Sequence, residues 1–117
     1  MQVRTETLDS GVVQVQLNGR LDILGAQAIE VRFTALTAIS GGAILVDLSE
    51  VTFLASLGMR TLLATAKGVN ARGGRLVLYK PQPNVREVLD TSGLSNLIPV
   101  QDDLHEALSI LREITGR

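Results

Sequence analysis

The chain has 117 residues, the length of one ordinary domain, and no cysteine, which excludes disulfides and thiolate metal sites. Its 11 basic and 12 acidic side chains give a formal net charge of −1, a balance that lacks the positive surface needed to bind nucleic acid or anionic membranes. The N-terminus has no signal-peptide pattern and no apolar run could span a bilayer, so we expect one cytoplasmic domain over residues 1–117, without membrane insertion.

Apolar periodicity and turn residues divide the chain into nine elements. Alternating apolar and polar residues indicate strands, and apolar residues three and four apart indicate helices. In chain order the pattern predicts strands at residues 3–8 and 13–17, a helix at 26–39, a strand at 43–48, a helix at 56–71, a strand at 76–79, a helix at 83–90, a strand at 98–100 and a helix at 104–114.

Turn formers support several of these boundaries. Residues 9–11, Asp-Ser-Gly, separate the first two strands, and the glycines at residues 41–42 would end the first helix. Pro83 suits the first turn of the third helix, and Gly93 follows its end. Pro99 places the last strand at an edge of the sheet.

The last helix has both a start signal and an apolar stripe. Asp103 with Glu106 three positions later resembles a capping box. Leu104, Leu108 and Leu111 lie at helical spacing and would form the buried side of this helix.

The element order β-β-α-β-α-β-α-β-α fixes the fold class. Strands that alternate with helices favour parallel pairing through right-handed crossovers. We therefore predict a single α/β domain with a mostly parallel, mixed sheet of about five strands and four helices.

The chain lacks the residue patterns of an active site. His105 is the one histidine, and no cluster of ligating side chains has metal-binding spacing. We interpret the carboxylates of Asp47, Glu50, Asp102 and Asp103 as strand-end and cap residues. We therefore expect no catalytic residue, no cofactor and no metal, and a protein that is not an enzyme.

Ser56 is the residue at which the fold prediction and a functional hypothesis meet. The strand at residues 43–48 is followed by a short loop, and the second helix opens near Ser56. From the residues alone, Ser56 is best explained as the helix N-cap, where serine stabilises by about 1 kcal/mol over alanine.

Four short segments are spread along nearly the whole chain: residues 19–22 (Gly-Arg-Leu-Asp), 46–53, 55–58 (Ala-Ser-Leu-Gly) and 91–94 (Thr-Ser-Gly-Leu). Together and in this order they resemble the STAS domain, the family of anti-sigma-factor antagonists and of cytoplasmic tails of sulphate transporters. The segment at 55–58 is similar to the family's phosphorylation motif. The resemblance implies that Ser56 is the phosphoacceptor.

The resemblance implies partner switching in the regulation of transcription. The unmodified protein would bind an anti-sigma factor with kinase activity and displace the sigma factor. The kinase would phosphorylate Ser56 and lower the affinity, and a serine phosphatase would reset the switch. A phosphate at a helix N-terminus meets free N–H groups, so we expect the fold to stay almost unchanged.

The helical wheel of residues 56–71 predicts a docking side. If Met59, Leu62, Leu63 and Ala66 point inward, a small apolar stripe of Leu57, Thr61, Ala64 and Gly68 lies outward, bordered by Arg60 and Lys67. Our candidate partner-binding residues, taken from this stripe, from the phosphorylation motif and from the preceding strand end, are Asp22, Ala55, Leu57, Gly58, Arg60, Thr61 and Ala64. For Asp22, a turn or cap role is equally compatible with its position.

Three other interpretations remain open. Ala55 and Leu57 differ from the residues that usually flank the family's phosphoacceptor, which favours a STAS regulatory or adaptor module, in a stress-signalling or lipid-transport assembly, that is not phosphorylated. A flavodoxin-like receiver domain would need an acidic cluster near its first parallel strands and a lysine after a late strand. Only Asp22 follows the second strand, and Lys80 follows a different strand from the one that carries the receiver lysine. A small enzyme would need a nucleophile–base pair, and the sequence shows none.

Overall fold

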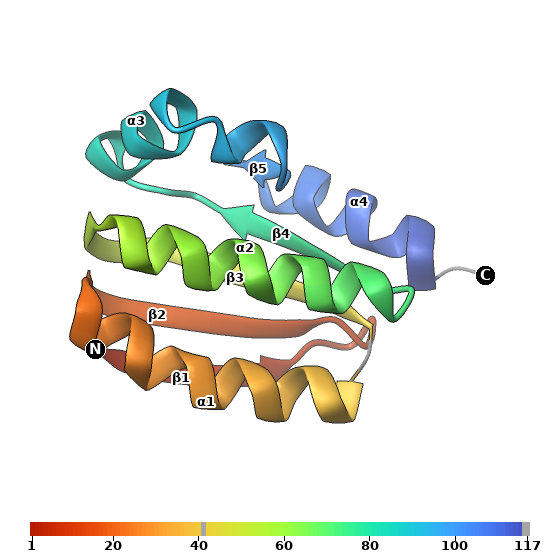
Figure 1. Ribbon diagram of the computed structural model, residues 1–117. Helices are drawn as coiled ribbons and strands as arrows, with labels where there is room; N and C mark the ends of the chain where they lie inside the picture. Colours follow the sequence, from red (N-terminus) through yellow and green to blue (C-terminus); the bar gives the residue numbers. More distant parts are fainter. Residues whose placement is uncertain (41, 116–117) are drawn as a thin grey trace.

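Five strands form one sheet in which spatial neighbours follow one another in chain order (Figure 1). The computed structural model describes residues 1–40 and 42–115. The elements are β1 (Gln2–Thr7), β2 (Val13–Leu21), α1 (Ile23–Ser40), β3 (Ala43–Leu54), α2 (Ser56–Ala71), β4 (Arg75–Tyr79), α3 (Pro83–Thr91), the 3-10 helix η1 (Leu94–Asn96), β5 (Val100–Gln101) and α4 (Leu104–Thr115).

The strand pairing confirms the predicted fold class. β1 pairs with β2 in the antiparallel direction, and β2–β3, β3–β4 and β4–β5 are parallel. The described residues therefore form an α/β domain with a mixed, mostly parallel sheet of five strands and with four α-helices in the predicted order.

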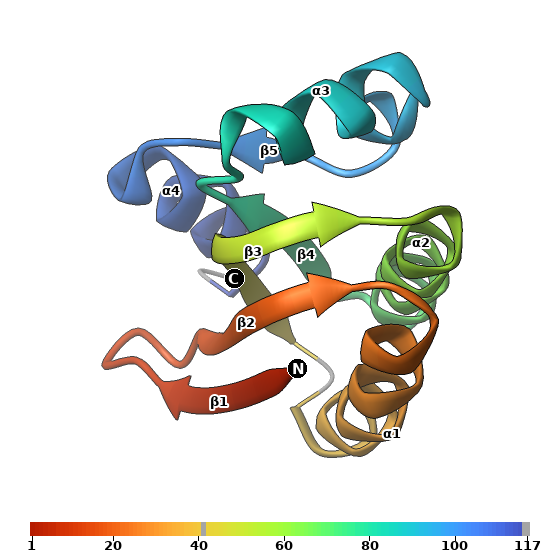
Figure 2. The same ribbon diagram turned by 90° about the vertical axis from the view of Figure 1, so that its left-hand side faces the viewer.

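Helices cover the two faces of the sheet unequally (Figure 2). Apolar residues of α1, α2 and α3 share one core with the sheet, to which Ile29, Leu62 and Val85 belong. α4 packs on the opposite face, where Ala107 and Leu111 belong to a second, smaller core. From β2 to β5 the parallel strands lie side by side in chain order, and each connection between them is a right-handed crossover. The three connecting helices therefore lie on the same face of the sheet.

Part of the second face carries no helix. α4 contacts β3, β4 and β5, whereas β1 and β2 present polar side chains there, including Arg4, Gln16 and Asn18. The alternation in β2 explains this division, because Val15 and Leu17 are buried in the first core while Gln16 and Asn18 are exposed.

β3 is longer than predicted. The prediction ended this strand at residue 48 and placed a loop before Ser56, but β3 continues to Leu54. Its second half pairs with the end of β2, up to Leu21 opposite Leu54. Asp47 and Glu50 therefore lie inside a strand, and the interpretation of both as strand-end residues was wrong.

α1 starts three residues before the predicted position, because Asp22 caps it. The Asp22 carboxylate accepts a hydrogen bond from the Gly25 amide at 3.1 Å, and its carbonyl accepts one from the Ala26 amide at 2.8 Å. Of the two glycines predicted to end the helix, Gly41 lies outside the described residues.

The C-terminal third differs from the prediction in three details. The last strand is Val100–Gln101, two residues later than its predicted start, although it does lie at a sheet edge. The 3-10 helix η1 was not predicted. Asp103 caps α4 by accepting hydrogen bonds from the His105 and Glu106 amides, but Leu104 is exposed, and Ala107 occupies the buried side with Leu111.

α2 spans the predicted residues, and its first turn packs closely on the sheet. A Cβ atom added to Gly58 would lie 2.6 Å from the Leu21 carbonyl oxygen and 2.7 Å from the Leu21 Cγ. At Gly68, in the same helix, the equivalent position has no atom within 4 Å apart from the neighbouring backbone of the helix itself. The two glycines therefore form a matched pair, one at a close contact and one in open space.

We predict that Gly58→Ala destabilises the protein by about 1–3 kcal/mol, because α2 must move away from the end of β2. Gly68→Ala should instead raise the stability by up to about 1 kcal/mol through helix propensity alone. Urea unfolding of both variants measures this difference. Equal effects of the two substitutions would contradict the close packing at Gly58.

Candidate functional site

Ser56 is the first residue of α2, and it is exposed. The N-cap position belongs to Ala55, which has extended backbone angles (φ −95°, ψ 167°) and no side chain able to cap. The interpretation of Ser56 as the N-cap was therefore wrong by one position. Its hydroxyl is free of that role, and the first N–H groups of α2 have no side-chain cap.

A backbone junction fixes the position of this helix start. The Ala55 amide donates a hydrogen bond to the Leu21 carbonyl at 3.0 Å, and the Met59 amide donates to the Ala55 carbonyl at 3.0 Å. Because Leu21 and Ala55 are bonded, the next residues in the chain, Asp22 and Ser56, lie at the same end of the sheet. This arrangement brings together two of the predicted site residues.

Asp22 is a helix cap, the structural role that its position after a strand end also predicted. It caps α1, and its second carboxylate oxygen lies 3.5 Å from the Arg20 Nε. The hydrogen bond from the Gly25 amide is the main cause that lowers the pKa of Asp22, and Arg20 lowers it further. Asp22 is thus a carboxylate at neutral pH, and it is partly exposed beside the start of α2.

The predicted docking residues on α2 differ in how exposed they are. Arg60 and Ala64 are exposed, whereas Leu57 and Thr61 are half-buried. Gly58 is buried against Leu21 and offers a partner no exposed surface.

The inward side of α2 was predicted only in part. Leu62 and Ala66 are buried, as predicted. Met59 and Leu63 are only half-buried, and they line a groove of about 290 Å³ together with Ser56 and Arg60 of α2 and with Ser92, Leu94 and Leu97. Leu97 is 62% exposed. The helical wheel did not predict this groove, because it divides α2 into a buried and an exposed side and carries no information about the neighbouring segments.

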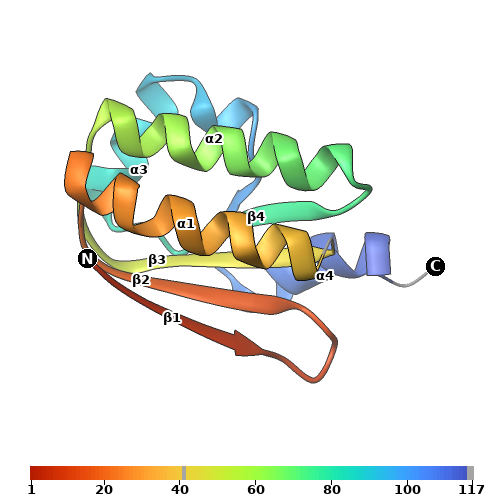
Figure 3. The same cartoon turned by 60° about the horizontal axis from the view of Figure 1, so that its bottom comes forward.

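The start of α1 adds apolar surface that the sequence did not reveal. α1 and α2 run side by side and begin at the same end of the sheet (Figure 3). Ile23 is 58% exposed and Leu24 is 75% exposed, both in the first turn of α1. They were missed because the helix was predicted to begin at residue 26, which left them in a loop.

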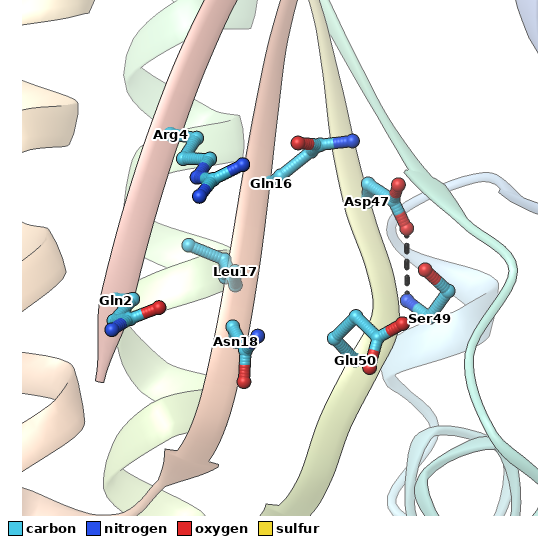
Figure 4. Close-up of a pocket in the computed structure, with 8 residues that line it drawn as sticks. All are labelled: Gln2, Arg4, Gln16, Leu17, Asn18, Asp47, Ser49 and Glu50. Carbon is cyan, nitrogen blue, oxygen red and sulfur yellow. Dashed lines mark hydrogen bonds between the residues drawn. The ribbon is translucent and has the colours of Figure 1, made fainter.

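A second hollow lies on the open face of the sheet, away from Ser56 (Figure 4). It has a volume of about 420 Å³ and is lined by Gln2, Arg4, Gln16, Leu17, Asn18, Asp47, Ser49 and Glu50. Asp47 is buried, and its carboxylate accepts a hydrogen bond from the Ser49 amide at 2.9 Å. This hollow contains no histidine that could serve as a base for Ser49, since His105 is exposed on α4.

Two further searches cover residues 1–40 and 42–115. Within that part of the chain, no three histidine, aspartate or glutamate side chains are grouped so as to hold a metal ion. No helix there is long and apolar enough to cross a bilayer.

Known proteins resemble this chain in both sequence and fold. The family model described as the STAS domain matches residues 4–107. Anti-sigma-F factor antagonist RsfB of Mycobacterium tuberculosis is 31% identical over 111 residues, which cover 88% of this chain and 84% of RsfB.

Two solved proteins have closely similar folds. An anti-sigma factor antagonist from Mycobacterium paratuberculosis has a TM-score of 0.84 at 29% identity, covering 95% of this chain and 93% of that one. The anti-sigma factor antagonist SpoIIAA in its unphosphorylated form has a TM-score of 0.78 at 26% identity, covering 97% and 98%. Its phosphorylated form, from Bacillus, has a TM-score of 0.69 at 24% identity, covering 95% and 100%.

The family model spans most of the chain, and two solved anti-sigma factor antagonists that share this fold are more than 25% identical to it. The chain therefore belongs to the STAS domain family.

Proposed function

We propose that this protein is an anti-sigma-factor antagonist of a partner-switching pathway. In its unmodified form it binds an anti-sigma factor that has kinase activity, and phosphorylation of Ser56 releases it. The observation that carries the proposal is the exposed hydroxyl of Ser56 at an uncapped helix start. The names of its relatives support the choice of partner.

The geometry at Ser56 suits a switch that changes binding and leaves the fold unchanged. A phosphate adds about −1.5 to −2 charges at neutral pH. Placed on the first residue of α2, it meets N–H groups that have no side-chain cap and the positive end of the helix dipole. These groups stabilise the phosphate, so the modified protein keeps its structure.

Arg60 strengthens this argument. It lies four residues after Ser56, which is one helical turn, and its side chain is exposed. An acidic group at the first position and a cation four residues later is the favourable order for a helical ion pair. Arg60 can therefore pair with a phosphate on Ser56. It makes no ion pair within residues 1–40 and 42–115, so in the unmodified protein it can meet an acidic group of the partner.

We define the α2 docking surface as Asp22, Ser56, Leu57, Arg60, Thr61 and Ala64. Asp22 and Arg60 supply charges of opposite sign, and Leu57, Thr61 and Ala64 supply small or apolar contacts between them. A phosphate at Ser56 would stand inside this surface, so a partner that fits the hydroxyl form would meet both extra bulk and extra charge.

We predict that the cognate kinase phosphorylates Ser56 and that this lowers the affinity for the anti-sigma factor at least hundredfold, about 2.7 kcal/mol. Phosphopeptide mass spectrometry locates the modification, and calorimetry measures the affinity. Circular dichroism and the melting temperature should change little. Ser56→Ala should bind and resist phosphorylation, whereas Ser56→Glu should bind weakly.

Two outcomes would reject different parts of the proposal. Binding to the anti-sigma factor without any phosphate on Ser56 would favour the alternative of a STAS regulatory or adaptor module that is not phosphorylated. A large change in melting temperature after phosphorylation would mean that the modification acts on the fold.

Substitutions on the exposed side of α2 test the docking surface. Ala64→Arg should reduce binding to the anti-sigma factor at least tenfold, because Ala64 lies about 12 Å from Ser56 along the helix. Ala71→Arg is the matched control, since the same substitution stands about 22 Å from Ser56 at the other end of α2. Both residues are exposed, so neither variant should lose stability. Equal binding by both variants would exclude this surface.

Two substitutions separate the charge of Asp22 from its cap. In Asp22→Asn the side-chain oxygen still accepts the Gly25 amide and only the charge is lost, so partner affinity should fall and the melting temperature should drop only slightly. Asp22→Ala removes both the charge and the cap, so it should lower the melting temperature further. Because the pKa of Asp22 is lowered on folding, its carboxylate stabilises the protein at neutral pH, and this contribution is lost as the pH falls through the folded-state pKa. Unchanged affinity in Asp22→Asn would restrict Asp22 to its cap role.

A further inference from the structure

β1 is an edge strand that no other described element covers. It lies at the outside of the sheet (Figure 3), where it pairs with β2 on one side only. An edge strand presents unpaired N–H and C=O groups that can pair with another strand. A strand that pairs with β1 must match its outward N–H and C=O groups and the charges of its side chains.

The hairpin geometry shows which backbone groups of β1 face outward. The Leu8 amide donates to the Val12 carbonyl at 2.8 Å. The β1–β2 register ends at Thr7 opposite Val13, and continuing it by one residue places Leu8 opposite Val12. In an antiparallel pair the N–H and C=O of one residue point to the same side, and the side alternates along the strand. The even-numbered residues therefore bond to β2, and Val3, Thr5 and Thr7 direct their backbone groups outward.

The side chains of β1 alternate in the same way. Arg4 stands opposite Gln16 on the polar face of the sheet (Figure 4). Glu6 stands opposite Gln14, and because each lies two residues along its strand from the first pair, their side chains are on the same face. Both charged side chains are exposed, and in residues 1–40 and 42–115 neither makes an ion pair. β1 thus carries one positive and one negative charge, two residues apart, with neutral glutamines as their neighbours on β2.

We propose that β1 is a self-association surface, on which two copies of this chain pair β1 with β1 in the antiparallel direction about a two-fold axis at Thr5. In this register Arg4 of each copy stands opposite Glu6 of the other, so the pattern of charges is complementary to itself. Thr5 stands opposite its own copy, and Val3 stands opposite Thr7. The outward N–H and C=O groups of these odd-numbered residues then bond across the axis.

The charges select this register over its neighbours. A two-fold axis at Arg4 would place two arginines opposite each other, and an axis at Glu6 would oppose two glutamates. Charged residues on edge strands normally keep other strands away, and here like charges reject both adjacent registers. Arg4 and Glu6 form pairs without direct backbone bonds between them, in which the Cα atoms approach to about 4.5 Å and the side chains are closest.

The pairing would join two five-stranded sheets and leave the α2 docking surface open. α2 connects β3 to β4, and β2 lies between these strands and β1 in the sheet. In addition, α2 packs on the face of the sheet opposite to the one that carries the Arg4 side chain. Self-association through β1 is therefore independent of the proposed binding to an anti-sigma factor, and each can fail without the other.

Sedimentation velocity of the full chain, from low micromolar to submillimolar concentration at low salt, tests the pairing. We expect a monomer–dimer equilibrium. Arg4→Glu and Glu6→Arg should each weaken the dimer about tenfold or more, because each replaces two attractive pairs with two repulsive ones. The double variant Arg4→Glu/Glu6→Arg restores complementary charges and should restore the dimer.

Two controls identify the surface. Arg72→Glu reverses an exposed charge beyond the end of α2 and should leave the dimer intact. Thr5→Pro removes an outward N–H and no bond to β2, so it should abolish the dimer with little loss of melting temperature. A monomer at all concentrations would overturn the proposal, as would a dimer that Arg4→Glu leaves unchanged or a double variant that fails to restore it.

Discussion

The hydrogen bond from the Ala55 amide to the Leu21 carbonyl holds the candidate site together. It ties the end of β3 to the end of β2 and fixes the point at which α2 begins. The same carbonyl oxygen lies where only a glycine fits at position 58, so α2 is pressed onto the sheet at its first turn. Ser56 is held between these two contacts, which set its direction toward solvent. The exposed serine is thus a consequence of backbone geometry that the surrounding strands impose.

Most of the fold could be predicted because local and global patterns agree. Residues 56–71 have apolar spacing for one helix and a strand end before them, and α2 has these bounds. The second half of β3 could not be predicted, because Ser49, Glu50 and Thr52 resemble a loop when considered alone. They belong to a strand because β2 extends alongside and pairs with them up to Leu54. Pairing over a long sequence distance overrides local propensity there.

The sequence predicted the helix start at Ser56, but it did not predict what surrounds that residue. The position of Ser56 follows from where the helix starts. The groove beside it does not, because Leu94 and Leu97 come from a 3-10 helix and the residue after it, distant in sequence. The exposure of Ile23 and Leu24 depends on the start of α1, which the Asp22 cap sets. A contact between elements far apart along the chain decides the first feature and a local helix cap decides the second, and apolar periodicity carries no information about either.

The lack of a side-chain cap at Ala55 supports the proposed switch at this helix start. A serine or aspartate at the N-cap would bond the first N–H groups of α2 and leave them unavailable. With alanine there, no side chain caps the helix, so those N–H groups can donate hydrogen bonds to an oxygen of solvent, of a partner or of a phosphate on Ser56. A partner's acceptor and a phosphate would compete for the same donors. Mutually exclusive occupancy of one helix start is sufficient for a two-state switch, and it requires no movement of the sheet beneath.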